Sequence, residues 1–321
     1  MIDSTIENPC YDTVGIFYPF NSEEEFMNEL NRISPLLEQS ELKRKNHTGA
    51  IILTGKIRNI KAVVTRSGVS IIGSLCVYHK GNNYLSMTRK EVMLCILSLQ
   101  VLLGLPLQNA IVRRLDFGCC LKMNERPEIY FSSLGSCGKY ERWSREYSQY
   151  YETKYKTLIF YNKTIEMTSR NFTGLPEQIH NNTLRFELRM RRQLAYQLNR
   201  EVVLVKDLYD EQFYKEMIDR WMNEYERINK NKLLSPIKNN LSCNDGIDYT
   251  LSSLIELHGT NNLTKIIERL KYKFTRGAFA RYQKKLKSLK FLSKESELIT
   301  ELNTKILLIK ENALFIASNE G

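Results

Sequence analysis

Three short segments carry side chains whose types and spacing suit the cleavage of a phosphodiester bond. Arg114 and Asp116 lie two residues apart, Tyr161 and Lys163 lie two residues apart, and the third segment reads Arg185-Phe186-Glu187-Leu188-Arg189. Each run alternates apolar and polar residues, a pattern typical of a half-buried strand whose polar side chains share one face. A sheet that joins the three faces would offer carboxylates for a divalent cation, cations for a phosphate, and a tyrosine to attack it.

The same residues also have a simpler interpretation. Arg114 with Asp116, and Arg185 with Glu187, could form ion pairs on an exposed sheet face, which contribute little to function or stability. Tyr161 could be a core aromatic residue with its hydroxyl at the rim of the core. The order of the three motifs, taken up below, is what favours the catalytic interpretation.

The composition favours a polyanionic partner. The chain has 321 residues, with 47 Lys and Arg against 36 Asp and Glu, a net charge of +11 and a pI near 9.2. Such an excess is typical of proteins that bind nucleic acid or an anionic membrane surface, although some basic proteins bind neither. The most apolar stretch, residues 92–107, is too short to span a bilayer and contains Ser98, Gln100 and Gly104. The sequence therefore favours nucleic acid over membrane.

The cysteines and the N-terminal residues indicate a reducing compartment. The seven cysteines show no CxxC spacing, and Cys119 and Cys120 are adjacent, so strand geometry would point them to opposite faces. The first ten residues lack the basic and apolar runs of a signal peptide. We therefore expect reduced thiols, no cysteine-bound metal, and a cytoplasmic protein.

The elements predict an α+β fold in two parts. The first, residues 1–235, is an antiparallel sheet with flanking helices; the second, residues 236–321, is smaller, all-helical and basic. Strands are expected at 14–20, 50–57, 62–66, 69–78, 110–121, 157–167 and 183–190. Capping boxes at Ser22 and Thr88 predict helices to about Leu37 and Leu103, and a further helix is expected over 207–228. Residues 140–156 are expected to form a loop or short hairpin near the site, and a short helix to begin within 191–200.

The most basic stretch of the chain lies in the second part, at residues 264–290. Its pattern of helix, turn and helix, with aromatic residues among the cations, indicates a helix-turn-helix-like DNA module. The alternative is the solvated basic face of an ordinary helical bundle. The residues expected to contact DNA are Arg276, Arg281, Lys284 and Lys285.

The order of the motifs resembles a known family. Arg114-Leu115-Asp116, then Thr157 to Glu166 with Tyr161-Asn162-Lys163 inside it, then Leu184 to Arg189, resembles the gene II/X replication initiators of filamentous phages and, more distantly, plasmid rolling-circle initiators. Gly81-Asn82-Asn83 stands where that family has a Gly/Asn turn. The resemblance covers roughly residues 50–230.

The resemblance implies a site-specific nicking and rejoining enzyme that holds the cut 5′ end as a phosphotyrosine ester. Tyr161 would be the nucleophile, and because a phenol with a pKa near 10 attacks poorly, it would need a nearby cation such as Lys163. Asp116 and Glu187 would bind Mg²⁺ or Mn²⁺, while Arg114, Arg185 and Arg189 neutralise the phosphate. Origin DNA, double- and single-stranded, would be the partner, with a host helicase and polymerase, and a dimer on DNA is compatible with this. The resemblance also implies the cytoplasm of a bacterial cell that hosts a plasmid or phage.

Several alternatives remain open. Tyr150 and Tyr151 precede the same strand and are rival nucleophiles. Many rolling-circle nickases bind their metal with a histidine pair, whereas His47, His79, His180 and His258 are far apart in this sequence, so carboxylates must carry the metal or the protein does not nick. The second hypothesis is a non-catalytic origin-binding initiator with winged-helix or helix-turn-helix units.

Overall fold

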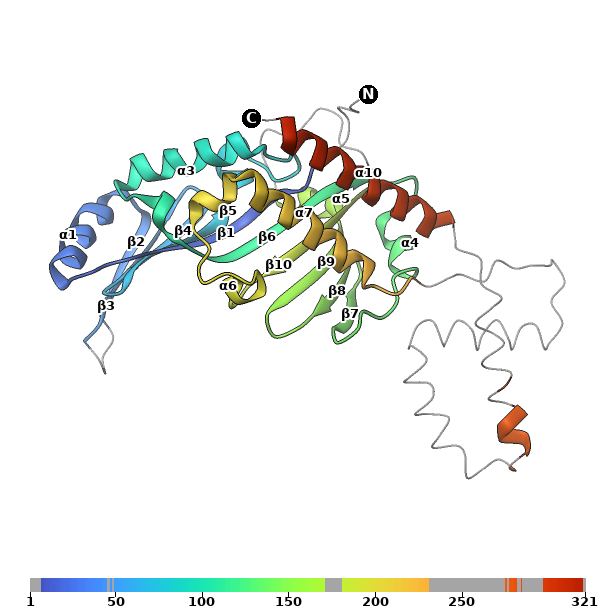
Figure 1. The fold of residues 1–321 in the computed structure, drawn as a ribbon. Helices are drawn as coiled ribbons and strands as arrows, with labels where there is room; N and C mark the ends of the chain where they lie inside the picture. Colours follow the sequence, from blue (N-terminus) through green and yellow to red (C-terminus); the bar gives the residue numbers. More distant parts are fainter. Residues whose placement is uncertain are drawn as a thin grey trace.

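The computed structural model is built around one antiparallel sheet (Figure 1). It describes residues 7–44, 47, 49–170, 181–230, 275, 277–281, 284 and 297–319. Ten strands lie in the order β2-β3-β4-β5-β1-β6-β10-β9-β8-β7. Their bounds are β1 Cys10–Pro19, β2 Glu38–Arg44, β3 Ile51–Ile57, β4 Ile60–Thr65, β5 Gly68–Ser74, β6 Ile111–Lys122, β7 Glu141–Arg145, β8 Ser148–Glu152, β9 Lys156–Asn162 and β10 Thr183–Met190.

Helices flank this sheet, which confirms the predicted α+β class. They are α1 Glu23–Ile33, α2 Leu75–Lys80, α3 Arg89–Leu103, α4 Pro127–Phe131, α5 Lys163–Arg170, α6 Leu194–Gln197, α7 Glu211–Glu226 and α10 Glu297–Asn319, with 3-10 turns at Ser34–Leu36, Leu107–Asn109 and Val205–Tyr209. Within the described residues, no helix is long and apolar enough to cross a membrane.

Two helices cover one face of the sheet. The Phe186 ring of β10 stacks on Phe160 of β9 at 4.3 Å and contacts Trp221 of α7, with ring centroids 4.9 Å apart. Helix α10 lies along α7 (Figure 1), where the Tyr225 hydroxyl donates to Asn303 Oδ1 at 2.6 Å. Because side chains alternate along a strand, this packing leaves the polar residues of β10 on the opposite face.

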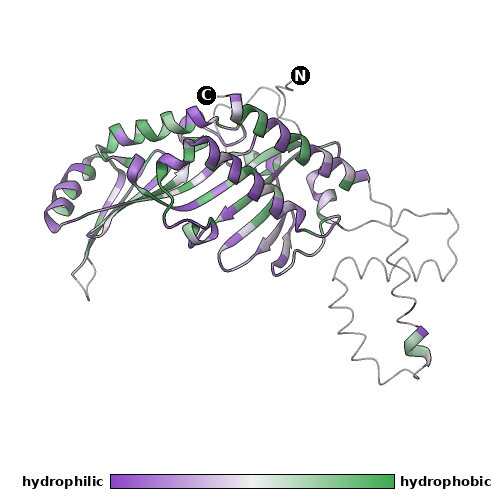
Figure 2. Ribbon diagram, in the orientation of Figure 1, coloured by the Kyte–Doolittle hydropathy of each residue, from purple (hydrophilic) through white to green (hydrophobic). Residues whose placement is uncertain are grey.

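Local signals determine where several helices begin. Thr88 and Glu91 form the predicted capping box: the Glu91 amide donates to Thr88 Oγ1 at 3.1 Å, and the Thr88 amide donates to Glu91 Oε2 at 2.8 Å. Ser22 caps α1 by accepting from the Glu25 amide. The helix α3 is largely hydrophobic along its length (Figure 2), and its Val101 is exposed.

Several predicted boundaries were wrong. The strand expected over 14–20 begins at Cys10. The strand expected over 69–78 ends at Ser74, whose hydroxyl caps α2 by accepting from the Val77 amide. The strand expected over 157–167 ends at Asn162, because Asn162 Oδ1 accepts from the Ile165 amide and starts α5. The helix expected to reach Leu37 ends at Ile33 and is followed by β2, an exposed edge strand that was not predicted. The helix expected from residue 207 begins at Glu211.

Among the described C-terminal residues, 277–281 and 297–319 are helical, which supports in part the prediction of an all-helical second part. Near the end of α10 the Ala317 carbonyl accepts from Arg89 Nη2 of α3 at 2.7 Å. The predicted domain boundary near residue 235 and most of the basic stretch at 264–290 lie outside the described residues, as do Arg276 and Lys285. Arg281 and Lys284 are described, and both are exposed.

Candidate active site

Strand register brings the three predicted motifs onto one face. β10 lies between β6 and β9, so that Arg185 stands opposite Tyr161, and Arg189 stands opposite both Asp116 and Thr157. Glu187 lies between these two arginines on β10 and faces Gly118 of β6. The apolar alternation in the sequence, which points Leu184, Phe186 and Leu188 into the core, is what turns the charged residues to this side.

Glu187 is the centre of the site. Its Oε1 accepts from the Tyr161 hydroxyl at 2.9 Å and from Arg185 Nε at 2.5 Å. Its Oε2 accepts from Arg189 Nε at 2.9 Å and Nη2 at 2.7 Å. The residue is 1% exposed, so these contacts form away from solvent, where charge pairs interact strongly.

Asp116 is the second carboxylate of the site. Arg114 binds it through two bonds, Nε to Oδ1 at 3.0 Å and Nη2 to Oδ2 at 2.6 Å. Arg189 Nε lies 3.8 Å from Asp116 Oδ2, so the Arg189 guanidinium contacts both Asp116 and Glu187. The two carboxylates therefore share one arginine.

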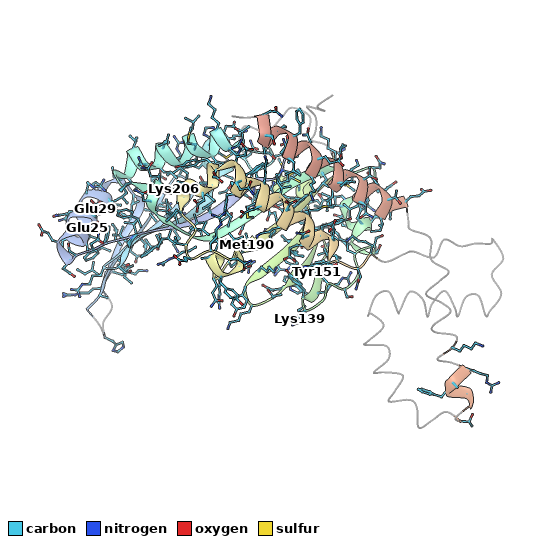
Figure 3. All side chains as sticks on the ribbon, in the orientation of Figure 1. Glu25, Glu29, Lys139, Tyr151, Met190 and Lys206 are labelled. Atoms are coloured by element: carbon cyan, nitrogen blue, oxygen red, sulfur yellow. The ribbon has the colours of Figure 1, made fainter. Side chains whose placement is uncertain are left out.

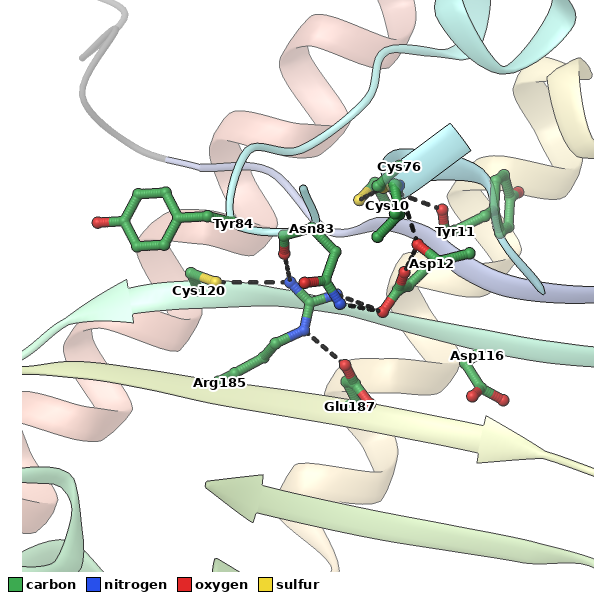
Figure 4. Close-up of polar contacts among 12 residues, drawn as sticks. Cys10, Tyr11, Asp12, Cys76, Asn83, Tyr84, Asp116, Cys120, Arg185 and Glu187 are labelled. Atoms are coloured by element: carbon green, nitrogen blue, oxygen red, sulfur yellow. Dashed lines mark hydrogen bonds and ion pairs between the residues drawn. The ribbon is translucent and has the colours of Figure 1, made fainter. Parts of the chain in front are cut away.

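A buried polar network behind Glu187 was missed in the sequence (Figure 4). Arg185 Nη1 donates to the Asn83 carbonyl at 3.0 Å, and Arg185 Nη2 lies 3.5 Å from Asp12 Oδ2. Asn83 Nδ2 donates to the same Asp12 oxygen at 2.9 Å, and Lys163 Nζ donates to Asn83 Oδ1 at 2.6 Å. The Gly81-Asn82-Asn83 turn has a sequence signal, whereas Asp12 has none, because its partner Arg185 lies 173 residues away.

Lys163 is placed differently from the prediction, although it remains at the site. It is the first residue of α5 rather than part of the strand, and its side chain is fully buried. Its Nζ lies 5.8 Å from the Tyr161 ring centroid and donates to Glu166 Oε2 at 2.6 Å. Lys163 thus joins the Asn83 turn to α5 beside the tyrosine.

Burial and charge set the protonation of the site. Burial, followed by the nearby Glu187 charge, raises the pKa of Tyr161 well above its usual value. Burial also raises the pKa of Glu187, but Arg189 and Arg185 outweigh it and hold that pKa below its usual value. Burial raises the pKa of Asp116 to about 6 despite Arg114. At neutral pH the site therefore holds a protonated tyrosine and two ionised carboxylates.

The rival tyrosines lie on opposite faces of β8. The Tyr151 hydroxyl donates to the Gly135 carbonyl at 2.7 Å, and Tyr151 (labelled in Figure 3) is buried on the core face. Tyr150 points to the site face, where its ring stacks on Trp143 of β7 with centroids 3.8 Å apart. It lines the same pocket as Tyr161. The structure thus brings Tyr150, and not Tyr151, towards Tyr161.

The two predicted magnesium ligands, Asp116 and Glu187, lie on the same face of the sheet. Mg²⁺ usually takes one or two carboxylates from a protein, and water and phosphate complete its coordination. Asp116 and Glu187 would supply those carboxylates, although arginines contact both of them here. Among the described residues, no group of three His, Cys, Asp or Glu side chains could hold a metal ion. A metal at this site would therefore rest on the two carboxylates and on the DNA itself.

Comparison with known proteins identifies the family. Residues 33–212 match the family described as the N-terminal region of a phage replication-associated protein. The matched span contains β2 to β10, both carboxylates, Tyr161 and the Asn83 turn, whereas Asp12 precedes it. No curated protein matches the chain. Because the match covers more than half of the sequence, the chain belongs to this family, that of the filamentous-phage gene II-type replication initiators.

Proposed function

We propose that this replication initiator nicks one strand of its origin DNA and later rejoins it through a covalent 5′-phosphotyrosine on Tyr161. The observation that carries the proposal is the hydrogen bond from the Tyr161 hydroxyl to Glu187, 2.9 Å long and flanked by Arg185 and Arg189. A tyrosine paired with a carboxylate acceptor and surrounded by phosphate-binding cations is the arrangement that nucleophilic attack on a phosphodiester requires.

In the proposed reaction, Tyr161 Oη attacks the phosphorus. A bond forms between this oxygen and phosphorus, and the bond from phosphorus to the 3′ oxygen breaks. The 3′ oxygen leaves as a hydroxyl after taking a proton from solvent water, to which the pocket is open. The phenol proton passes to Glu187 Oε1, which already accepts it in a hydrogen bond. Rejoining is the same exchange in reverse, so the ester conserves the energy of the broken bond and no ATP is needed.

Arg189 couples DNA binding to this proton transfer. Its side chain is 23% exposed and lines the pocket beside Tyr161, whereas that of Arg185 is 2% exposed. When a DNA phosphate draws Arg189 away from Glu187, the carboxylate loses a stabilising cation and its pKa rises. Glu187 then becomes a better base at the moment the phosphate arrives.

A divalent cation and the partners complete the proposal. Asp116 and Glu187 would hold Mg²⁺ or Mn²⁺, which when bound supplies Lewis-acid polarisation of a phosphoryl oxygen. Arg114, which pairs with Asp116 in this structure, would then be available to bind the phosphate. Origin DNA is the substrate, and a host helicase and polymerase would extend the free 3′ end.

A nicking assay tests this function. Supercoiled DNA that carries the replicon's own origin is incubated with Mg²⁺ and the wild type, Tyr161→Phe or Tyr151→Phe. We expect open circles with the wild type and with Tyr151→Phe, whose ring lies on the core face, and none with Tyr161→Phe. Origin binding without any nick by the wild type would overturn the proposal in favour of a non-catalytic initiator.

A further inference from the structure

A solvent-open pocket lies beside Tyr161 on the site face of the sheet. Its cavity volume is about 250 Å³, just below the usual range of small-ligand pockets. Its apolar walls come from Tyr147, Tyr150, Ile159 and Ile165, and Tyr161 lies at its side. Tyr161 is only 7% exposed, and it lines this solvent-open pocket. A substrate would therefore approach Tyr161 through the pocket.

Tyr150 is an aromatic wall of this pocket. The register places it between Trp143 on β7 and Ile159 on β9. Its ring stacks on Trp143 at 3.8 Å with an interplanar angle of 5°, so that face is covered. Tyr150 lines the pocket together with Ile159 and Tyr161 of β9, and Arg145 Cζ lies 5.7 Å from its ring centroid. An aromatic ring fixed in this way is a rigid stacking platform.

The charged groups of the pocket suit a sugar-phosphate backbone. Arg189 and Arg170 both line it, from β10 and α5. Glu166 Oε1 accepts from Arg170 Nε at 2.9 Å, which holds that guanidinium beside the pocket. Phosphate oxygens are strong acceptors for arginine, and an aromatic wall beside two guanidiniums is the combination that proteins use for single-stranded nucleic acid.

We propose that this pocket takes an unpaired nucleobase of the cleaved strand, stacked on Tyr150, next to the phosphate that Tyr161 attacks. The inference rests on the proposed function and deepens it: the strand must be single-stranded at the cut, with one base turned into the pocket. Stacking on a tyrosine is tolerant of base identity because every base has a π-face. Tyr150 is therefore a binding residue and not the nucleophile.

Binding of two single-stranded probes tests the pocket. A fluorescent twelve-residue oligothymidylate is compared with an abasic oligonucleotide of the same length and charge, using the full chain and fluorescence anisotropy. We expect the wild type to bind the thymidylate roughly 5- to 150-fold more tightly, as stacking of one or more bases predicts. Tyr150→Ala should remove most of this preference, and Tyr150→Phe should keep it.

Two further variants make the test independent of folding at Tyr150. Tyr147 is 40% exposed at the pocket, so Tyr147→Ala should fold and still weaken thymidylate binding. Phe315 on α10 is exposed on the helical side of the sheet, and Phe315→Ala should leave both affinities unchanged. Equal affinity of the wild type for both probes, or an equal loss for both in Tyr150→Ala, would overturn the inference.

The two proposals can fail separately. If the wild type prefers thymidylate but never nicks its origin, the base pocket is supported and the nicking function is refuted. If the wild type nicks but binds both probes equally, the nicking function is supported and the base pocket is refuted. Loss of the covalent adduct in Tyr150→Phe, with thymidylate preference intact, would show that Tyr150 is the nucleophile and would contradict its assignment as a binding residue only.

Discussion

At the scale of single residues, the buried positive and negative charges of the site compensate one another. Glu187 balances Arg185 and Arg189, and each of these groups would be costly to bury without the others. The Tyr161 hydroxyl donates a hydrogen bond to the same carboxylate. The site is therefore an assembly whose members depend on each other for stability as well as for chemistry.

Glu187→Gln is expected to lower the free energy of unfolding by about 3–5 kcal/mol, because it leaves two guanidiniums buried without their counter-charge. Urea denaturation measures the change. The matched control is Glu216→Gln, which breaks a surface pair with Arg200 and should cost less than about 1 kcal/mol. Equal losses in the two variants would show that Glu187 does not compensate the buried arginines.

Asp116 predicts a pH dependence. Its pKa in the folded protein is raised from 3.8 to about 6, chiefly by burial, so the folded state binds its proton more tightly than the unfolded state does. Its contribution to stability is therefore complete below about pH 4 and is lost as the pH rises through about 6.

Asp116→Asn should remove this pH dependence. Variant and wild type should unfold with equal free energies near pH 4, and the variant should be more stable by up to about 3 kcal/mol above pH 7. Chemical denaturation across this pH range measures the difference. A difference in the free energy of unfolding that does not change with pH would contradict the raised pKa of Asp116. The same variant should fail to nick, because it loses a carboxylate proposed to hold the metal.

At the scale of elements, the contact between β6 and β10 positions both carboxylates. A Cβ atom at Gly118 would lie 2.2 Å from the Phe186 carbonyl oxygen and 2.8 Å from Glu187 Cα. Gly118→Ala must therefore push the strands apart, which should cost about 1–3 kcal/mol and displace Glu187. Gly277→Ala, with no atom within 4 Å of the new Cβ, is the control. Nicking and stability like those of the wild type in Gly118→Ala would refute this role.

Strands with a clear alternation of apolar and polar residues could be predicted from the sequence. The end of β9 and the edge strand β2 could not. β10 was predicted with its observed bounds because Leu184, Phe186 and Leu188 mark one face throughout. β9 was predicted too long because Ile165 and Met167 continue the alternation, while the Asn162 cap that starts α5 is a single side chain. β2 is exposed along its whole length and so has no apolar pattern to detect.

The site was predictable where its residues lie on such strands. Asp116, Glu187 and the arginines share a face by alternation, and their spacing alone indicates it. Asp12 and Asn83 could not be found, because their contacts with Arg185 depend on a turn and a strand that pack 102 and 173 residues away in the sequence. Such contacts follow from the sheet order, which local patterns do not determine.

At the scale of the whole molecule, the net charge of +11 should make DNA binding strongly dependent on salt. Arg281 and Lys284 are exposed and belong to the stretch proposed to contact DNA. If each meets a phosphate, Arg281→Ala/Lys284→Ala should reduce the slope of log K against log salt by about 1.8. Anisotropy titrations on duplex DNA at several salt concentrations measure the slope.

The control for that experiment lies on the helical side of the sheet. Lys215→Ala/Arg227→Ala removes the same charge from α7 and the residue after it, where each cation pairs with a neighbouring glutamate. This variant should keep the wild-type slope. A slope unchanged by Arg281→Ala/Lys284→Ala would contradict the proposed contact.

The central claim is that Tyr161 forms the covalent bond to DNA, and peptide mapping of the adduct tests it most directly. Protein trapped on nicked origin DNA is digested with nuclease and trypsin, and the nucleotide-bearing peptide is identified by mass spectrometry. Tyr161 is the one tyrosine in Thr157–Lys163, whereas Tyr147, Tyr150 and Tyr151 fall in Glu146–Lys154 and exposed Tyr196 falls in Gln193–Arg200. We predict the nucleotide on Thr157–Lys163; its presence on either other peptide would contradict the account.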